Sequence, residues 1–266
     1  MKKSRSHQFV HKIKTMPPKD RLDRAKTVMR QIQYKADDLL LRLENIEALG
    51  ACLRPMANGE YSLAAAAANQ IVGDLISQGI IALIAVWDRP DWNAVSIPTL
   101  VSLLDHEDLP RIVSKDAYEN YLALDPVPPF GWLTAPDGKP WSVSEFHLME
   151  AEKRRSRVID AYPKTLKSAL ILGEEVRSAL KDARNVRTHS IDSPREAGRS
   201  EFKPAAFGDV ITQTEQPARL IEDLHLLVHG NCLTLARSSN TSAVNEFWSN
   251  MTFAWPPCNE PMDAQN

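Results

Sequence analysis

Apolar residues recur at helical spacing along most of the chain. Between residues 20 and 53 they step by four, seven, four and three positions, which places them on one face of a long helix ending near Gly50. A second, very apolar helix is predicted over residues 61–87. Pro90 and its neighbours then break the chain, because proline restricts the preceding residue and cannot donate to a helical ladder. The predicted inner face of the first helix consists of Val28, Ile32, Leu39, Leu43 and Ile46.

Shorter elements follow. Ser96 can cap a helix that runs through Leu104, with Pro98 in its first turn. Another short helix is predicted over 115–124. Residues 125–140 hold five prolines and two glycines and are predicted to form a loop.

Two further helices are predicted on either side of Pro163. The first is a charged helix over 142–162, and the second runs over 164–189, because proline is favoured in the first turn of a helix. Its predicted inner side consists of Leu166, Leu170, Val176, Leu180 and Ala183.

The last elements follow a loop that begins near residue 192. A brief extended segment is expected around Val210 and Ile211, and a long helix over 217–237. The tail after Trp255 is expected to be loose. The apolar positions of the last helix are Leu220, Leu224, Leu227, Val228 and Leu235.

These elements predict an all-α fold, a bundle of four to five main helices with additional short helices. We expect a basic N-terminal arm over 1–24, a single helical domain over 25–237 that includes the loop at 125–140, and a short helix and loose tail over 238–266. The apolar segment 61–87 contains Asn69, Gln70 and Asp74, and a charge is costly at the centre of a bilayer. A helix at the centre of the bundle, and no membrane contact, is therefore expected.

Composition agrees with a folded globular protein. The 266 residues are 43 % hydrophobic and 25 % charged, with a formal net charge of -2. Three widely spaced cysteines do not form a disulfide framework, and no secretory leader is recognised, so a cytoplasmic location is expected. Residues 1–30 hold ten Lys or Arg against two Asp. This basic segment can either contact phosphates or form a solvated helix face.

The common catalytic and cofactor motifs are absent. The sequence contains no glycine-rich phosphate loop, no GxSxG and no HExxH motif. His225, His229 and Cys232 form the best metal candidate, but no carboxylate is spaced as a further ligand, and a surface or interface position is the alternative. We therefore predict neither a bound metal nor a cofactor.

One short segment combines the side chains needed for phosphodiester chemistry. Arg184, Asn185 and His189 lie near the end of the predicted helix over 164–189, and Asn185 and His189, four residues apart, share a helical face. An imidazole can remove the proton of a ribose 2′-hydroxyl, and a guanidinium can stabilise the charge that grows on the phosphoryl oxygens. The alternative is a polar helix end at which Arg187 and His189 complement the helix dipole.

With these residues the chain resembles the HEPN superfamily, whose motif is Arg, a polar residue that is often Asn, and His four to six residues after the Arg. The layout is similar to its abortive-infection AbiU-like branch, in which a long helix leads to an Asp-Arg-Pro-like break and an Ile-Pro-x-Leu helix start. Here these segments are Trp87-Asp88-Arg89-Pro90 and Ser96-Ile97-Pro98-Thr99-Leu100. The resemblance extends over roughly residues 25–235.

The resemblance implies a helical bundle that pairs as a symmetric homodimer and a metal-independent ribonuclease of phage defence or of a toxin-antitoxin system. His189 would then transfer protons, and Arg184 would bind the scissile phosphate. Asn185 would position one of these two side chains. Lys181 and Arg187 would hold flanking phosphates. RNA, a second copy of the chain and an antitoxin or regulatory protein are the implied partners. Some members of the superfamily only bind nucleic acid or nucleotides, or are modified by a partner, so a non-catalytic helical module that binds RNA or other proteins is the alternative.

Overall fold

The computed structural model describes residues 5–53, 63–126, 138, 141–192, 207–233, 235, 244 and 246–248. Within these residues the chain is helical and contains no strand, which confirms the all-α prediction. Most of the loop predicted at 125–140 and the tail after Trp255 lie outside the described residues. The labelled helices are α1 (Arg5–Lys14), α2 (Pro18–Leu53), α3 (Leu63–Val86), α4 (Ile97–Leu104), α5 (Leu109–Leu122), α6 (Val143–Asp192) and α7 (Phe207–His229).

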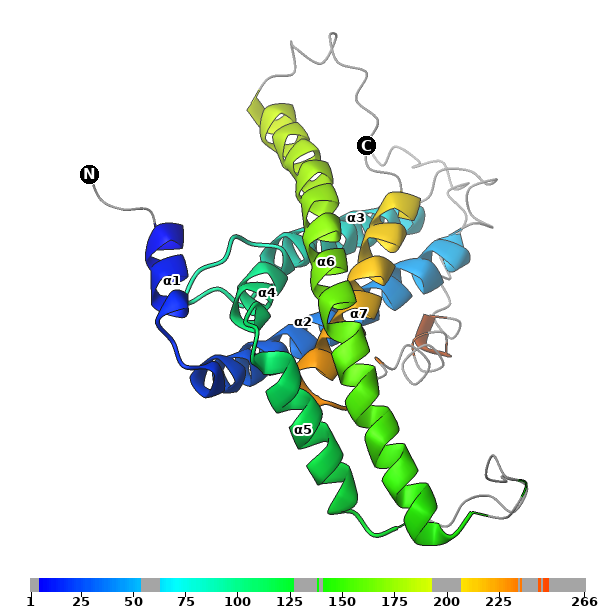
Figure 1. Ribbon diagram of the computed structural model, residues 1–266. Helices are drawn as coiled ribbons and strands as arrows, with labels where there is room; N and C mark the ends of the chain where they lie inside the picture. The colour runs from blue at the N-terminus through cyan, green and yellow to red at the C-terminus, as the bar shows by residue number, and fades with distance from the viewer. Residues whose placement is uncertain are drawn as a thin grey trace, which may run out of the picture.

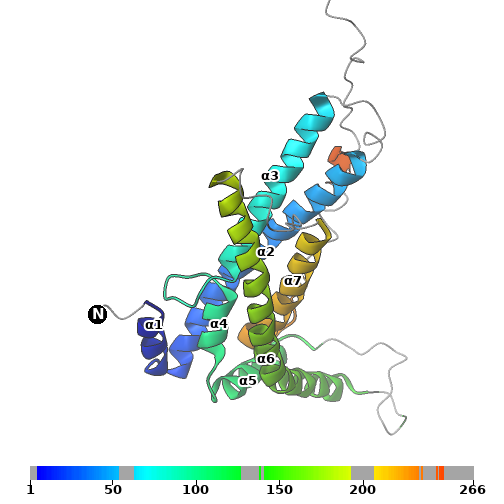
Figure 2. The ribbon, with the colours of Figure 1, turned by 90° about the horizontal axis from the view of Figure 1, so that it is seen from above.

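Helix α2 is the central element of the fold. It packs against α3, α4 and α7, while α6 packs along α5 and α7 and also contacts α4 (Figures 1 and 2). The apolar face predicted for α2 is buried as expected, with exposed fractions of at most 5 %. None of the described helices is long and apolar enough to span a bilayer.

The turn between α3 and α4 follows the sequence prediction closely. The Ser96 hydroxyl caps α4 by accepting the backbone N–H of Thr99 at 3.3 Å, and Pro98 lies in the first turn. The turn contacts α1 through the rings of Phe9 and Trp92 and contacts α2 through a hydrogen bond from Lys35 to the Val95 carbonyl. Helix α5, in contrast, starts at Leu109 and not at the predicted residue 115, because Asp108 and Pro110 begin the helix six residues earlier.

The predicted break at Pro163 is wrong, since α6 is one helix that contains this proline. Pro163 cannot donate to the carbonyl of Ile159, but both residues are exposed, so water can bind this carbonyl. Buried residues on both sides, among them Val158 and Ala169, hold the two halves against the rest of the bundle. The helix changes direction along its length in Figure 2, as expected of a helix with an internal proline.

The inner face of the second half of α6 also differs from the prediction. Leu170 is 60 % exposed, whereas Thr165 and Ala169, which were not predicted on this face, are buried; Val176 is buried as predicted. The prediction followed the largest apolar side chains, but two of the buried positions carry small residues. Leu166 is partly buried, as predicted, and the side chains of Leu180 and Ala183 lie outside the described residues.

Helix α7 is shifted toward the N-terminus relative to its prediction. It begins at Phe207, so the extended segment expected at Val210 is wrong, and it ends at His229 and not at residue 237. Gly230 ends the helix with a φ of 70°, and its N–H donates to the carbonyl of Leu226 at 2.9 Å. The predicted apolar positions of α7 are buried: Leu220, Leu224, Leu227 and Val228.

The expected N-terminal arm contains α1 and the first residues of α2. Phe9 and Ile13 of α1 are buried in the core, and the boundary expected at residue 24 falls inside α2. The buried Arg21 side chain donates to the carbonyl oxygens of Ile13 and Asp105. Burial lowers the pKa of Arg21, although the nearby Asp105 opposes this effect.

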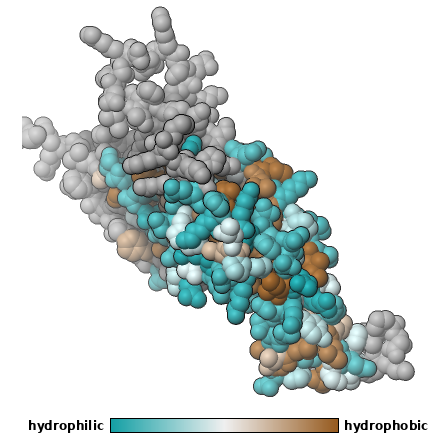
Figure 3. Space-filling view, turned by 60° about the vertical axis from the view of Figure 1, so that its left-hand side comes forward, coloured by the Kyte–Doolittle hydropathy of each residue, from teal (hydrophilic) through white to brown (hydrophobic). Residues whose placement is uncertain are grey.

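The face shown in Figure 3 is mostly hydrophilic where its residues are described. Apolar side chains form small separate groups on this face. Such scattered apolar groups are usual on a folded protein surface.

Candidate functional site

The predicted catalytic residues lie on the last turns of α6. Its backbone is helical through Asp192, so the structure agrees with the helical register assumed for Lys181, Arg184, Asn185, Arg187 and His189. In this register Asn185 and His189 share one side of the helix, and Lys181 lies one turn before Asn185. The side chains of all five residues lie outside the described residues, so their grouping into a site remains a prediction.

A basic cavity lies between the first half of α6 and the end of α7. It measures about 290 Å³, and cationic side chains of Lys153, Arg154 and Arg157 line it together with Glu150. These positions lie beside one another because side chains three or four residues apart on a helix are neighbours. The α7 end completes the wall with Leu226, Gly230, Asn231 and Cys232.

Arg154 is the most constrained cation of this cavity. Its guanidinium carbon lies 4.3 Å from the centre of the Tyr121 ring, and its Nε is buried with no hydrogen-bond partner in the described structure. Lys153 is paired with Glu150 at 3.2 Å, an exposed contact of small energetic value. A phosphate in the cavity could pair with the exposed Arg157.

Two histidines form a pair on the neighbouring face of α7. The rings of His225 and His229 are stacked with centres 4.4 Å apart. His225 Nδ1 lies 3.2 Å from the carbonyl oxygen of Asn231, and since a carbonyl only accepts, this nitrogen carries the proton. The residues Lys26 and Arg30 of α2 lie close enough to act on the charge of His229.

Both histidines are easier to deprotonate than a free imidazole. Burial, together with smaller effects of His225, Lys26 and Arg30 in the same direction, lowers the pKa of His229 to about 4. Burial also lowers the pKa of His225, although its bond to Asn231 opposes the shift. The pair is therefore largely neutral at pH 7.

The structure does not assemble the metal candidate considered from the sequence. Cys232 is exposed and lines the basic cavity, and no group of three His, Cys, Asp or Glu suited to a metal occurs among the described residues. Lys26 and Arg30 also place positive charge beside the histidine pair. A divalent cation would be repelled there.

The basic cavity was missed by the sequence analysis. The run of cations over 153–157 is visible in the sequence, and the spacing of Lys153, Arg154 and Arg157 indicates a shared helix face. Nothing in the sequence shows that the end of α7 lies opposite this face, because Asn231 is distant along the chain. The sequence also did not single out Asp223 of α7. Burial and Glu222 raise the pKa of this carboxyl group, although Arg157 opposes the shift.

Comparisons with known proteins identify no relative. No family model, no curated protein and no solved structure matches the chain.

Proposed function

We propose that the protein is a metal-independent RNA endonuclease of bacterial antiviral defence or of a toxin-antitoxin system. One observation carries this proposal. The pattern Arg184-Asn185-x-x-x-His189 lies on a helix that continues to Asp192, so Asn185 and His189 are four residues apart on one side of the helix, and Arg184 precedes Asn185 directly. A cytoplasmic location belongs to the same proposal.

The reaction needs a base, a cation and an orienting group. In the proposal His189 takes the proton of a ribose 2′-hydroxyl, whose oxygen attacks the adjacent phosphorus as the bond to the 5′-oxygen breaks. Arg184 stabilises the charge on the phosphoryl oxygens, and Asn185 positions the side chain of either His189 or Arg184. The products are a 2′,3′-cyclic phosphate and a 5′-hydroxyl, and a proton goes to the leaving oxygen.

Binding of the strand calls for further cations. Lys181 and Arg187 would hold phosphates next to the scissile bond, and the basic cavity around Arg154 offers a separate place for an anion on the same helix. Two copies of the motif would form a composite site in a homodimer. An antitoxin or other regulatory protein would control the activity.

Cleavage of total RNA in the presence of EDTA tests the proposal. We expect His189→Ala and Arg184→Ala each to lower the cleavage rate by at least about 100-fold, as is typical for loss of an acid-base or charge-stabilising group. His11→Ala and Arg155→Ala remove exposed residues of the same types outside the motif and should leave the rate unchanged. Thermal melts confirm that the four variants are equally folded.

The end groups and the mass add two independent checks. The 3′ fragments should carry a 5′-hydroxyl, and the 5′ fragments should carry a cyclic phosphate detectable by mass spectrometry. Light scattering should give about twice the chain mass of 29.8 kDa. A monomer at working concentration would contradict the composite site.

A non-catalytic helical module that binds RNA or proteins is the second candidate. The basic cavity favours it, because three cations around a hollow can bind a phosphate without any reaction. RNA binding without cleavage by the wild-type protein, under varied activating conditions, would support this candidate. Binding weakened by Arg154→Ala and Arg157→Ala would then assign it to the cavity.

A further inference from the structure

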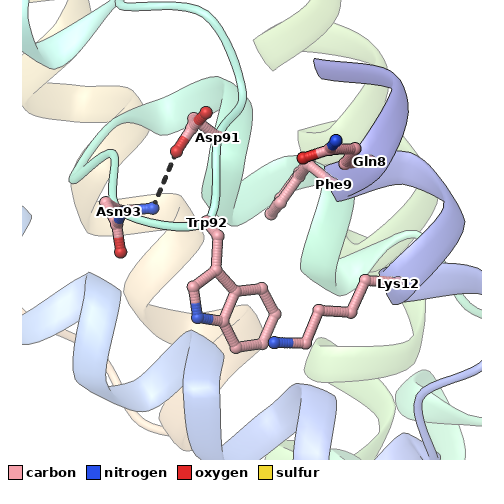
Figure 4. A pocket seen from close by; sticks show the side chains of 6 residues that line it. All are labelled: Gln8, Phe9, Lys12, Asp91, Trp92 and Asn93. Carbon is pink, nitrogen blue, oxygen red and sulfur yellow. Dashed lines mark hydrogen bonds between the residues drawn. The ribbon is translucent and has the colours of Figure 1, made fainter. Parts of the chain in front are cut away.

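A cavity of about 410 Å³ lies between α1 and the turn that joins α3 to α4. This volume falls in the range of roughly 300–1,000 Å³ that is usual for small-molecule sites. The cavity is separate from the motif at the end of α6 and from the basic cavity at the end of α7. Three residues of α1 and three of the turn line it, as Figure 4 shows: Gln8, Phe9, Lys12, Asp91, Trp92 and Asn93.

The Trp92 indole provides a flat aromatic surface in this cavity. Phe9 lies beside it, with ring centres 6.5 Å apart and planes tilted by 58°. The ammonium of Lys12 lies 3.5 Å from the centre of the indole (Figure 4). Lys12 is exposed, so a planar ligand can displace its flexible side chain from the indole without disturbing the core.

Polar groups surround this aromatic surface. The Asp91 carboxylate accepts the backbone N–H of Asn93 at 3.0 Å, which orients it at the cavity wall. A carboxylate can accept further hydrogen bonds, and the amides of Gln8 and Asn93 can both donate and accept. Such groups pair with the polar edges of nucleobases, whose flat faces stack on aromatic side chains.

The balance of charge distinguishes between ligand classes. An aromatic face alone would also attract an organic cation. Here, however, the Lys12 ammonium lines the cavity and the Arg24 guanidinium lies 5.3 Å from the indole centre, whereas Asp91 carries the only carboxylate among the described lining residues. Two cations and one anion disfavour a cationic ligand and favour a flat ring that carries a negative charge.

We infer that this cavity binds a nucleotide. The base stacks on Trp92 in place of Lys12, and the displaced ammonium pairs with the phosphate. Stacking of a base on an aromatic ring is stronger than an exposed cation–π contact, so the exchange is favourable. A free mononucleotide and a nucleotide within single-stranded RNA share this chemistry. The inference does not rest on RNA cleavage, because none of these residues belongs to the proposed catalytic motif.

Calorimetry and tryptophan fluorescence on the full chain test the inference. The probes are a nucleoside 5′-monophosphate, the matching uncharged nucleoside and a short 2′-O-methyl RNA that cannot be cleaved by 2′-hydroxyl attack. Wild type should bind the monophosphate saturably, with quenching of its fluorescence. Lys12→Ala should bind the monophosphate about tenfold more weakly, because the phosphate loses its partner, but should bind the nucleoside at least as well, because the competitor for the indole is gone.

The controls separate this site from general effects of charge and folding. Lys14→Ala removes the same charge from an exposed position of α1 outside the cavity and should bind all three probes like wild type. Trp92→Phe should remove most of the quenching and weaken binding while the far-ultraviolet dichroism stays unchanged. His189→Ala should bind like wild type, so a failure of the cleavage proposal would leave this inference unaffected.

The outcomes also distinguish the two sources of the nucleotide. If Lys12→Ala weakens binding of the 2′-O-methyl RNA as well, the cavity belongs to a path for an RNA strand. If only the monophosphate is affected, the ligand is a free nucleotide. Absence of saturable monophosphate binding, or equal losses in Lys12→Ala and Lys14→Ala, would overturn the inference.

Discussion

The hydroxyl of Tyr162 donates a hydrogen bond of 2.9 Å to the carbonyl oxygen of Leu104 and so joins α6 to the end of α4. Tyr162 is buried directly before Pro163, where α6 lacks one of its own backbone bonds. Burial raises the pKa of Tyr162, and Asp105 acts in the same direction, so the phenol stays protonated and donates. This contact holds the middle of α6 where its own ladder is weakest.

Replacing Tyr162 with Phe should lower the free energy of unfolding by about 1 kcal/mol, the usual net value of one hydrogen bond. The loss should be no larger, because the Leu104 carbonyl keeps a second donor, the N–H of His106 at 2.8 Å. Urea denaturation of wild type and Tyr162→Phe checks the value. Exposed Tyr34→Phe serves as the control and should change stability little. A loss equal to that of the control would contradict a structural role for the bond.

Features with a local physical cause could be predicted from the sequence. The start of α4 is an example, because the Ser96 hydroxyl, the Thr99 amide and Pro98 are near neighbours in the chain. The buried face of α2 is another, since it follows from the spacing of apolar residues alone. The continuation of α6 through Pro163 could not be predicted in this way. It depends on burial against other helices, which outweighs the local cost of the proline.

The candidate sites differ in the same way: one is formed by residues close in the sequence, and the others depend on the packing of distant elements. The pattern at Arg184, Asn185 and His189 is visible in the sequence because its members lie within two helical turns. The contact between Lys12 and Trp92 is not, since no periodic pattern relates α1 to the turn before α4. The basic cavity likewise depends on the end of α7, whose position is set by Gly230 and its packing on α5.

Gly230→Ala should destabilise the protein by at least about 2 kcal/mol. A φ of 70° is unfavourable for alanine, and a Cβ at this position would lie 2.5 Å from the Cβ of Ala117. Gly138→Ala is the matched control, because Gly138 also has a positive φ, of 80°, but its Cβ would meet nothing within 4 Å. It should therefore show only the smaller backbone cost. Chemical denaturation measures both values.

The double variant Gly230→Ala/Ala117→Gly tests the steric part of this prediction. Removing the Ala117 methyl group makes room for the new Cβ, so the double variant should be more stable than the sum of the two single changes predicts. Strict additivity would show that the contact with the Ala117 methyl group does not contribute to the loss.

Replacing Arg21 with Met should destabilise the protein by about 2–4 kcal/mol and loosen α1 in particular. Its guanidinium donates to the Ile13 carbonyl at 2.6 and 3.1 Å and to the Asp105 carbonyl at 2.9 Å, and hydrogen bonds from charged groups are worth more than neutral ones. Hydrogen exchange should become faster throughout α1. Exposed Lys19→Met is the control and should leave the exchange of α1 unchanged.

The same variant connects the fold to the inferred nucleotide site. Because α1 supplies Gln8 and Lys12 to the cavity, Arg21→Met should also weaken binding of the monophosphate at a temperature where the variant is fully folded. Wild-type affinity together with fast exchange in α1 would show that the cavity does not depend on this anchoring of the helix.

Stability should fall on acidification because of His229. Its pKa is lowered from 6.5 to about 4 in the folded protein, so between these pH values the unfolded chain binds a proton that the folded chain does not. This contribution is fully present above pH 6.5, is lost as the pH falls toward 4, and is constant below that. A full shift corresponds to a slope of about 1.4 kcal/mol per pH unit, but His229 is only partly buried, so we expect a total loss of about 1–2 kcal/mol.

His229→Gln isolates this contribution from that of other groups. Glutamine cannot titrate, so the difference in unfolding free energy between wild type and variant should change between pH 6.5 and 4 and stay constant above pH 7. Lys26→Gln should raise the pKa of His229, measured by NMR titration of the imidazole, because it removes one of the two neighbouring α2 cations. Parallel stability profiles of wild type and His229→Gln, or an imidazole that titrates at its ordinary value, would contradict the burial of this ring against α2.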